Sequence, residues 1–159
     1  MTADLVVKNG WVVTSQETFK GGIAIADEKF VSIGTDDSLP DGKEVIDAKG
    51  KHILPGLIDG HVHFREPGLT YKEDFGTGST AAVCGGITTV IDMPNVIPPT
   101  ADAGQIRLKQ RLAEDKSLVD FGVLAVVVQT NTAEIFPMAE AGMSMPWWAK
   151  TTNQMFAGL

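Results

Sequence analysis

The chain has 159 residues, of which 43% are hydrophobic, and its formal net charge is −7. Scattered charges at this hydrophobic content are typical of a folded chain rather than a disordered one. An acidic balance without any basic run argues against a nucleic-acid partner. No apolar stretch approaches the ~20 residues of a membrane helix, and the N-terminus lacks the pattern of a signal peptide. The single cysteine, Cys84, permits no intramolecular disulfide and suits the reducing cytoplasm, where we expect it as a small buried side chain on a helix.

Residues 1–52 are predicted to form a small β-meander. Five short segments rich in β-branched or apolar residues favour strands: 4–8, 11–15, 23–26, 30–33 and 44–47. Asn9-Gly10 is typical of a two-residue hairpin turn, because both residues tolerate positive φ. A second turn is expected at 27–29. A meander of this size is marginal by itself, so we expect it to pack on another element.

From residue 53 the pattern changes to strands that alternate with helices. The expected strands are 53–58, 87–93 and 119–128, and the expected helices are 70–84, 101–116 and 133–141. Thr70 and Glu73 fit a capping box for the first helix. The charged residues of the second helix, Lys109 among them, are expected to face solvent. This alternation favours an α/β fold with a parallel sheet and right-handed crossovers.

Glycine and polar residues mark the ends of these helices. Gly85-Gly86 and Gly142 are placed to stop the first and third helices. Asn131 or Thr132 is expected to cap the third. Three strand–helix units are under half of an eightfold barrel, which takes at least about 200 residues.

Polar side chains follow the first two apolar runs. His61 and His63 are separated by one residue, and alternate side chains of an extended chain point the same way, so both imidazoles can reach one point. Neutral imidazole is a favoured zinc ligand, although a bare His-x-His is also found without a metal. Arg65 continues the alternation and is suited to a substrate carboxylate. Asn95 follows the second strand, where barrel enzymes place working side chains.

Three other polar residues near the motif have simpler interpretations. We expect Asp59 to orient the motif from the strand end. Asp92 is expected to be structural, and His52 to be an exposed residue ahead of the strand rather than a ligand.

The run Pro-Gly-Leu-Ile-Asp-Gly-His-Val-His-Phe-Arg-Glu-Pro-Gly at 55–68 resembles the first metal-binding signature of the amidohydrolase superfamily. More narrowly, it is similar to that of the cyclic amide hydrolases: dihydroorotases, allantoinases and hydantoinases. A second block at 71–95 supports the likeness, which extends to about residue 142. The resemblance implies an incomplete TIM-type (β/α) barrel at 53–142, preceded at 1–52 by half of a composite β-sandwich.

The resemblance also implies a site. It assigns His61 and His63 as ligands of zinc or another divalent metal, which is binuclear in complete relatives. Arg65 and Asn95 match positions that hold the substrate carboxylate in dihydroorotases. Relatives carry a bridging lysine, two further histidines and a general-base aspartate on later strands; at the expected position of the lysine this chain has Trp147. No catalytic residue is therefore assigned within the chain.

The likeness ends near residue 142, and residues 143–159 form a divergent tail. Pro146 and two adjacent tryptophans argue against a central barrel strand there. A frameshift, a truncated gene product and a deliberately shortened chain are all compatible with this tail.

Three functions are compatible with these features. The first is metal-dependent, dihydroorotase-like ring-opening hydrolysis of a small cyclic amide or ureide, favoured by Arg65 with Asn95; an allantoinase- or hydantoinase-type activity is its close alternative. The second is a catalytically incomplete polypeptide, a pseudoenzyme or assembly partner, because exposed strand edges favour self-association. The third is a simple metal-binding module. None of the three involves a nucleic acid or a membrane.

Overall fold

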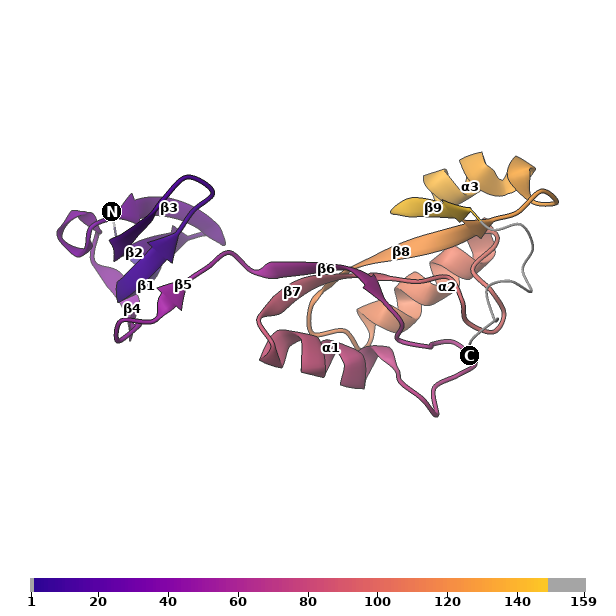
Figure 1. Cartoon of the computed structure of the whole chain (residues 1–159), viewed down its shortest axis with the longest axis horizontal. Coiled ribbons are helices and arrows are strands. Elements are labelled where there is room, and N and C mark those ends of the chain that lie inside the picture. Colours follow the sequence, from indigo (N-terminus) through magenta and orange to yellow (C-terminus); the bar gives the residue numbers. More distant parts are fainter. Residues whose placement is uncertain (1, 149–159) are drawn as a thin grey trace. The chain divides into compact units, whose positions relative to one another are not determined.

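The computed structural model describes residues 2–148, which divide between Pro55 and Gly56 into two compact units (Figure 1). The first unit is a five-stranded sheet. Its elements are β1 (Ala3–Val13), β2 (Thr18–Ala26), β3 (Lys29–Gly34), the 3-10 turn η1 (Asp36–Ser38), β4 (Gly42–Asp47) and β5 (His52–Ile53). The strand order is β3-β2-β1-β4, and β5 also pairs with β1. Because β4 and β5 run parallel to β1, the unit is more than the simple meander that the sequence predicts.

The predicted hairpin at Asn9-Gly10 is wrong, because β1 runs through this dipeptide. Asn9 does adopt a positive φ of 57°, but it forms an irregularity within the strand, where the register to β2 shifts between Val7 and Gly10. The Asn9 side chain donates a hydrogen bond to Asp47 at 3.1 Å. Pairing with β4 and β5 thus keeps β1 extended on both sides of the bulge. The predicted turn at 27–29 is confirmed.

The second unit contains a four-stranded parallel sheet with the order β6-β7-β8-β9. Its elements are β6 (Leu57–Val62), α1 (Phe75–Cys84), β7 (Ile87–Asp92), α2 (Ala103–Glu114), β8 (Asp120–Val127), η2 (Thr132–Glu134), α3 (Ile135–Glu140) and β9 (Met145–Trp148). The predicted alternation of strands and helices is therefore confirmed, and the sheet corresponds to part of a TIM-type barrel (Figure 1).

Two apolar clusters join the helices to this sheet. Phe64 and Phe75 pack edge-to-face, with ring centroids 5.7 Å apart, beside Val90 of β7 and Ala113 of α2. The second cluster joins Ile106, Val123, Ala125, Val127 and Met138, from α2, β8 and α3. Burial of each large aliphatic or aromatic side chain contributes about 1.5–3 kcal/mol, so these clusters fix the helices on the sheet.

The predicted buried strand at 53–58 is wrong. The run splits into β5 and β6, which belong to different units, and Pro55 between them has no N–H for a sheet. Leu57 and Ile58 are 51% and 71% exposed. Within residues 2–148, β6 pairs with β7 alone, so one of its edges stays open.

The predicted absence of a strand after residue 142 is also wrong for 145–148. These residues form β9, parallel to β8, with Pro146 opposite Ala125. Within the described part of the chain β9 is an edge strand, which is where a sheet tolerates proline. The rest of the tail, 149–159, lies outside the described residues.

The helix boundaries follow capping side chains that the sequence only partly reveals. Helix α1 begins at Phe75, and Asp74, rather than Thr70, caps it by accepting a 2.8 Å hydrogen bond from the Thr77 backbone N–H. Its end at Gly85 agrees with the prediction, as does Gly142 after α3. Asn131 occupies the N-cap position of η2, as one of the two predicted caps, but its side chain makes no capping hydrogen bond. It bonds instead to backbone groups of residues 101, 126 and 128.

Two burial predictions are wrong. Cys84, at the end of α1, is exposed rather than buried. Lys109, expected in solvent, is 1% exposed. Its ammonium forms an ion pair with Asp92 and donates a 2.7 Å hydrogen bond to the carbonyl of Met93. Burial lowers the pKa of Lys109, and the facing Asp92 carboxylate counteracts that shift. None of the helices in residues 2–148 has both the length and the apolar character of a membrane span.

Replacement of the α1 cap is expected to weaken the second unit. Asp74→Ala should lower the free energy of unfolding by about 1 kcal/mol, because the Thr77 N–H loses its acceptor. The hydrogen bond from the Thr77 backbone lowers the pKa of Asp74 below 3.8, so the charge-dependent part of this stability is present above 3.8 and is lost as the pH falls through the folded-state pKa. Urea unfolding followed by circular dichroism at neutral and acidic pH measures both effects.

Asp74→Asn is the matched control, since it keeps an acceptor oxygen without the charge. It should lose less stability than Asp74→Ala at neutral pH. An alanine variant as stable as the parent chain at neutral pH would contradict the assignment of the cap.

Candidate metal centre

The carboxyl end of β6 carries two imidazoles on one side. The ring centroids of His61 and His63 lie 5.1 Å apart, with their planes inclined by 60°. The backbone N–H of His61 donates to the Asp59 carboxylate at 3.1 Å, so Asp59 has the orienting contact expected from its position. The structure therefore brings together the two side chains that the alternation of an extended chain predicts to meet.

The His63 ring is held by Asn95 from the neighbouring strand end. Its Nδ1 lies 2.8 Å from Asn95 Oδ1, and Asn95 is only 8% exposed. An amide oxygen accepts and cannot donate, so this contact places the ring proton on Nδ1 and leaves the lone pair of Nε2 free. A hydrogen bond to the second ring nitrogen is the usual way in which metal-binding histidines are oriented. The sequence placed Asn95 near the site but did not reveal this contact.

Backbone hydrogen bonds flank His63 on both sides. The carbonyl of Val62 accepts from the Met93 N–H at 2.9 Å. The Phe64 N–H donates to Asp92 Oδ1 at 2.8 Å, and Asp92 is fully buried. The end of β6 is thus tied to the end of β7 immediately before and after the histidine. Asp92 is structural, as expected.

Arg65 lies in the loop that follows and has a positive φ of 61°. Such a conformation is strained for a residue other than glycine and is frequent at functional sites. Its Nη1 is buried and has no hydrogen-bond partner in the part of the chain that the structure describes. The next residue, Glu66, is 4% exposed and accepts from Lys116 Nζ at 2.6 Å and from the Phe75 N–H at 3.2 Å. The loop is therefore anchored, and it carries a guanidinium nitrogen available to an anion.

The donor set at the end of β6 fits a divalent metal in part. Two imidazoles on one side, one of them oriented through Nδ1, suit zinc and related ions. Catalytic zinc usually has three protein ligands, and within residues 2–148 no group of three His, Cys, Asp or Glu side chains converges. His61 and His63 could therefore hold a cation as part of a larger ligand set.

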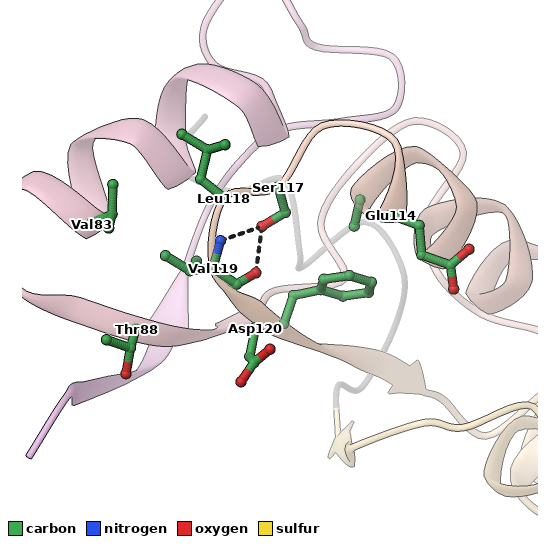
Figure 2. Close-up of a pocket in the computed structure, with 9 residues that line it drawn as sticks. Val83, Thr88, Glu114, Ser117, Leu118, Val119 and Asp120 are labelled. Carbon is green, nitrogen blue, oxygen red and sulfur yellow. Dashed lines mark hydrogen bonds between the residues drawn. The ribbon is translucent and has the colours of Figure 1, made fainter. Parts of the chain in front are cut away.

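A separate cavity of about 620 Å³ lies at the opposite ends of the strands (Figure 2). It is lined by residues such as Thr88 at the start of β7 and Asp120 at the start of β8. The Ser117 hydroxyl there is engaged with the backbone of Val119, at 2.7 Å from the carbonyl oxygen and 3.3 Å from the nitrogen. Parallel barrels place chemistry at the carboxyl ends of their strands, so the imidazole end is the better candidate site.

Comparison with known proteins shows which family this chain resembles. The amidohydrolase family matches residues 52–134. A dihydroorotase from Methanothermobacter thermautotrophicus is 54% identical over 103 residues, which cover 65% of this chain and 23% of that protein. An allantoinase from Desulfitobacterium hafniense is 43% identical over 142 residues, which cover 88% of this chain and 31% of that protein.

The fold is also similar to those of solved structures. The L-hydantoinase (dihydropyrimidinase) from Arthrobacter aurescens superposes with a TM-score of 0.84 at 34% identity, over 91% of this chain and 32% of that chain. The chain thus spans between about a quarter and a third of the length of these relatives. This chain belongs to the amidohydrolase family, which confirms the resemblance seen in its sequence. Members of the dihydroorotase and hydantoinase type are generally metal-dependent hydrolases of cyclic amides.

Substitution of either imidazole is expected to weaken metal binding. We expect Zn²⁺, titrated into the metal-free chain by calorimetry, to bind through His61 and His63. Loss of an outer hydrogen-bond partner usually lowers metal affinity by about 10- to 100-fold. His61→Ala and His63→Ala remove a ligand itself, so each should lower the Zn²⁺ affinity by more than this. His52→Ala is the matched control, because His52 is an exposed histidine of the first unit. Equal zinc affinity in all three variants would refute the site.

Proposed function

We propose that this chain provides the amino-terminal part of a metal-dependent hydrolase that opens cyclic amides. The observation that carries the proposal is the pair of imidazoles 5.1 Å apart at the carboxyl end of β6, with His63 oriented by Asn95. Membership of the amidohydrolase family supports it, as do relatives named dihydroorotase, allantoinase and hydantoinase.

His61 and His63 would hold zinc or another divalent cation at this end of the sheet. When bound, such a cation supplies an activated water and polarises the amide carbonyl. The contribution of this chain is to orient the ligands: Asn95 fixes the proton of His63 on Nδ1, which leaves Nε2 as the ligand atom. Because no group of three metal-ligating side chains converges within residues 2–148, further ligands would come from other groups. The resemblance to complete relatives assigns the general base to a later strand as well.

Arg65 favours a substrate that carries a carboxylate. Its buried Nη1 has no partner among the described residues, and a guanidinium binds a carboxylate through two parallel hydrogen bonds. Asn95, which lies at the adjacent strand end, would complete the contact. This combination favours a dihydroorotate-like substrate, with allantoin and hydantoins as the alternatives.

A second candidate function is that of a catalytically incomplete assembly partner. The open edge of β6 carries Leu57 and Ile58, which are 51% and 71% exposed. Exposed apolar strand edges pair readily with another chain. A simple metal-binding module is the third candidate, and it uses the same imidazoles without hydrolysis.

The 159-residue chain by itself is expected to show no appreciable turnover of dihydroorotate, allantoin or hydantoin. The physical reason is that no group of three His, Cys, Asp or Glu side chains able to hold a metal converges among its described residues, so the two imidazoles lack a third ligand from this part of the chain. A spectrophotometric or chromatographic assay of ring opening in the presence of Zn²⁺ measures this. Turnover that disappears in His61→Ala would show the expectation to be wrong.

A chimera tests the proposed function in a complete enzyme. Residues 1–142 replace the matching segment of the D. hafniense allantoinase, to which this chain is 43% identical over 142 residues. The chimera should hydrolyse a cyclic amide, and His63→Ala should abolish the activity while His52→Ala leaves it intact. The kcat/KM for dihydroorotate divided by the kcat/KM for allantoin should be higher in the chimera than in the parent allantoinase. Arg65→Met should bring this ratio back to the value of the parent enzyme.

The other outcomes separate the competing functions. A folded chimera that binds Zn²⁺ through His61 and His63 but opens no cyclic amide favours the metal-binding module. A folded chimera that binds no Zn²⁺ favours the assembly partner.

A further inference from the structure

Lys109 and Asp92 form a buried pair that ring-opening chemistry does not use. Lys109 of α2 is 1% exposed, and Asp92, the last residue of β7, is 0% exposed. The ammonium pairs with Asp92 Oδ2 and also donates to the carbonyl of Met93 at 2.7 Å. One side chain of α2 therefore holds two successive residues at the end of β7.

The same dipeptide, Asp92-Met93, holds the backbone on both sides of His63. Asp92 Oδ1 accepts from the N–H of Phe64 at 2.8 Å. The N–H of Met93 donates to the carbonyl of Val62 at 2.9 Å. The residues before and after the histidine are thus bonded to the dipeptide that Lys109 anchors.

The side-chain partner of His63 depends on the same anchor. Asn95 lies two residues after Met93, and its Oδ1 is 2.8 Å from His63 Nδ1. The His63 ring thus follows backbone that is bonded to Asp92 and Met93, and the Asn95 amide lies two residues beyond the carbonyl that Lys109 binds.

We propose that Lys109 is a positioning residue, which acts through Asp92 and Met93 to keep His63 hydrogen-bonded to Asn95 and its Nε2 free for a metal. The importance of this role for catalysis rests on the proposed function of His61 and His63. A buried ammonium–carboxylate pair adds little stability over apolar side chains of the same volume. Its additional bonds to two backbone groups, by contrast, determine where those groups lie.

Long-range ¹H–¹⁵N spectra of the imidazoles in the metal-free chain test this proposal. They are recorded at about pH 8.5, where model-compound imidazole is neutral. The His63 signals, identified by their loss in His63→Ala, should show a single tautomer protonated on Nδ1. In Lys109→Met they should show a mixture of both tautomers. The Zn²⁺ affinity measured by calorimetry should fall by about 10- to 100-fold, the usual effect of losing an outer-shell contact.

The double variant Asp92→Asn with Lys109→Met guards against misfolding, because it leaves no unpaired charge. Asn at position 92 still offers an oxygen to the Phe64 N–H, but the Met93 carbonyl loses its donor. This variant should also lose the single tautomer. Arg107→Met removes an exposed charge from the same helix and should keep the single His63 tautomer.

Ile106→Ala is the control for a loss of stability alone, since Ile106 is fully buried on the same helix but packs in the cluster with Val123. It should keep the single tautomer despite a lower urea midpoint. The same tautomer mixture in Ile106→Ala, or an unchanged tautomer and zinc affinity in the double variant, would overturn the proposal. Because the tautomer is read without metal, it decides the role of Lys109 even if His61→Ala leaves zinc binding unchanged and the proposed function fails.

Discussion

The buried ion pair of Lys109 and Asp92 is the contact on which the geometry of the imidazole end depends. Removal of one partner from such a pair costs about 3–5 kcal/mol, because the remaining charge stays buried without a counterion. Replacement of both partners by apolar groups is often neutral, so the pair is poorly explained as a source of stability alone. In this chain its oxygens and its ammonium also bind the backbone of Phe64 and Met93. Its main effect is to fix the register between the ends of β6 and β7.

The loop after His63 is held in a comparable way. Lys116, just after α2, pairs with the buried Glu66, which also accepts from the first N–H of α1. Arg65, which precedes Glu66, has a left-handed conformation, and its Nη1 is buried. Lys109, within α2, and Lys116, just after it, thus both contact the segments that hold the two imidazoles and the guanidinium in place. The candidate metal centre is thus surrounded by contacts from groups other than the imidazoles and the guanidinium.

Much of the fold of the second unit could be predicted from the sequence. The apolar runs at 87–93 and 119–128 and the glycines at 85–86 and 142 carry their information locally, in hydrophobicity and in backbone freedom. The errors arose where partners distant in sequence decide the structure. Asn9 has the left-handed φ of a hairpin turn, yet pairing with β4 and β5 keeps the strand extended. The run 53–58 is apolar on both sides of Pro55-Gly56, which favours a single buried strand, although Pro55 lacks the N–H of a sheet residue and marks the boundary of the two units.

In the candidate site, too, some features follow from local sequence and others depend on residues distant in sequence. The shared side of His61 and His63 follows from the two-residue period of a strand, and the structure brings their rings to 5.1 Å. The hydrogen bond between His63 and Asn95 depends on the pairing of β6 with β7, and sequence spacing alone does not predict that contact. Lys109 lies between Arg107 and Arg111 in the sequence, and its burial is explained by partners distant in sequence, the Asp92 carboxylate and the Met93 carbonyl.

The division between Pro55 and Gly56 separates the contacts of the imidazole end from the amino-terminal sheet. Every contact described at the imidazole end, from Asp59 to Lys116, is made by residues on the carboxyl side of that division. The arrangement of the two imidazoles, Asn95 and the Arg65 loop can therefore be accounted for by the second unit alone.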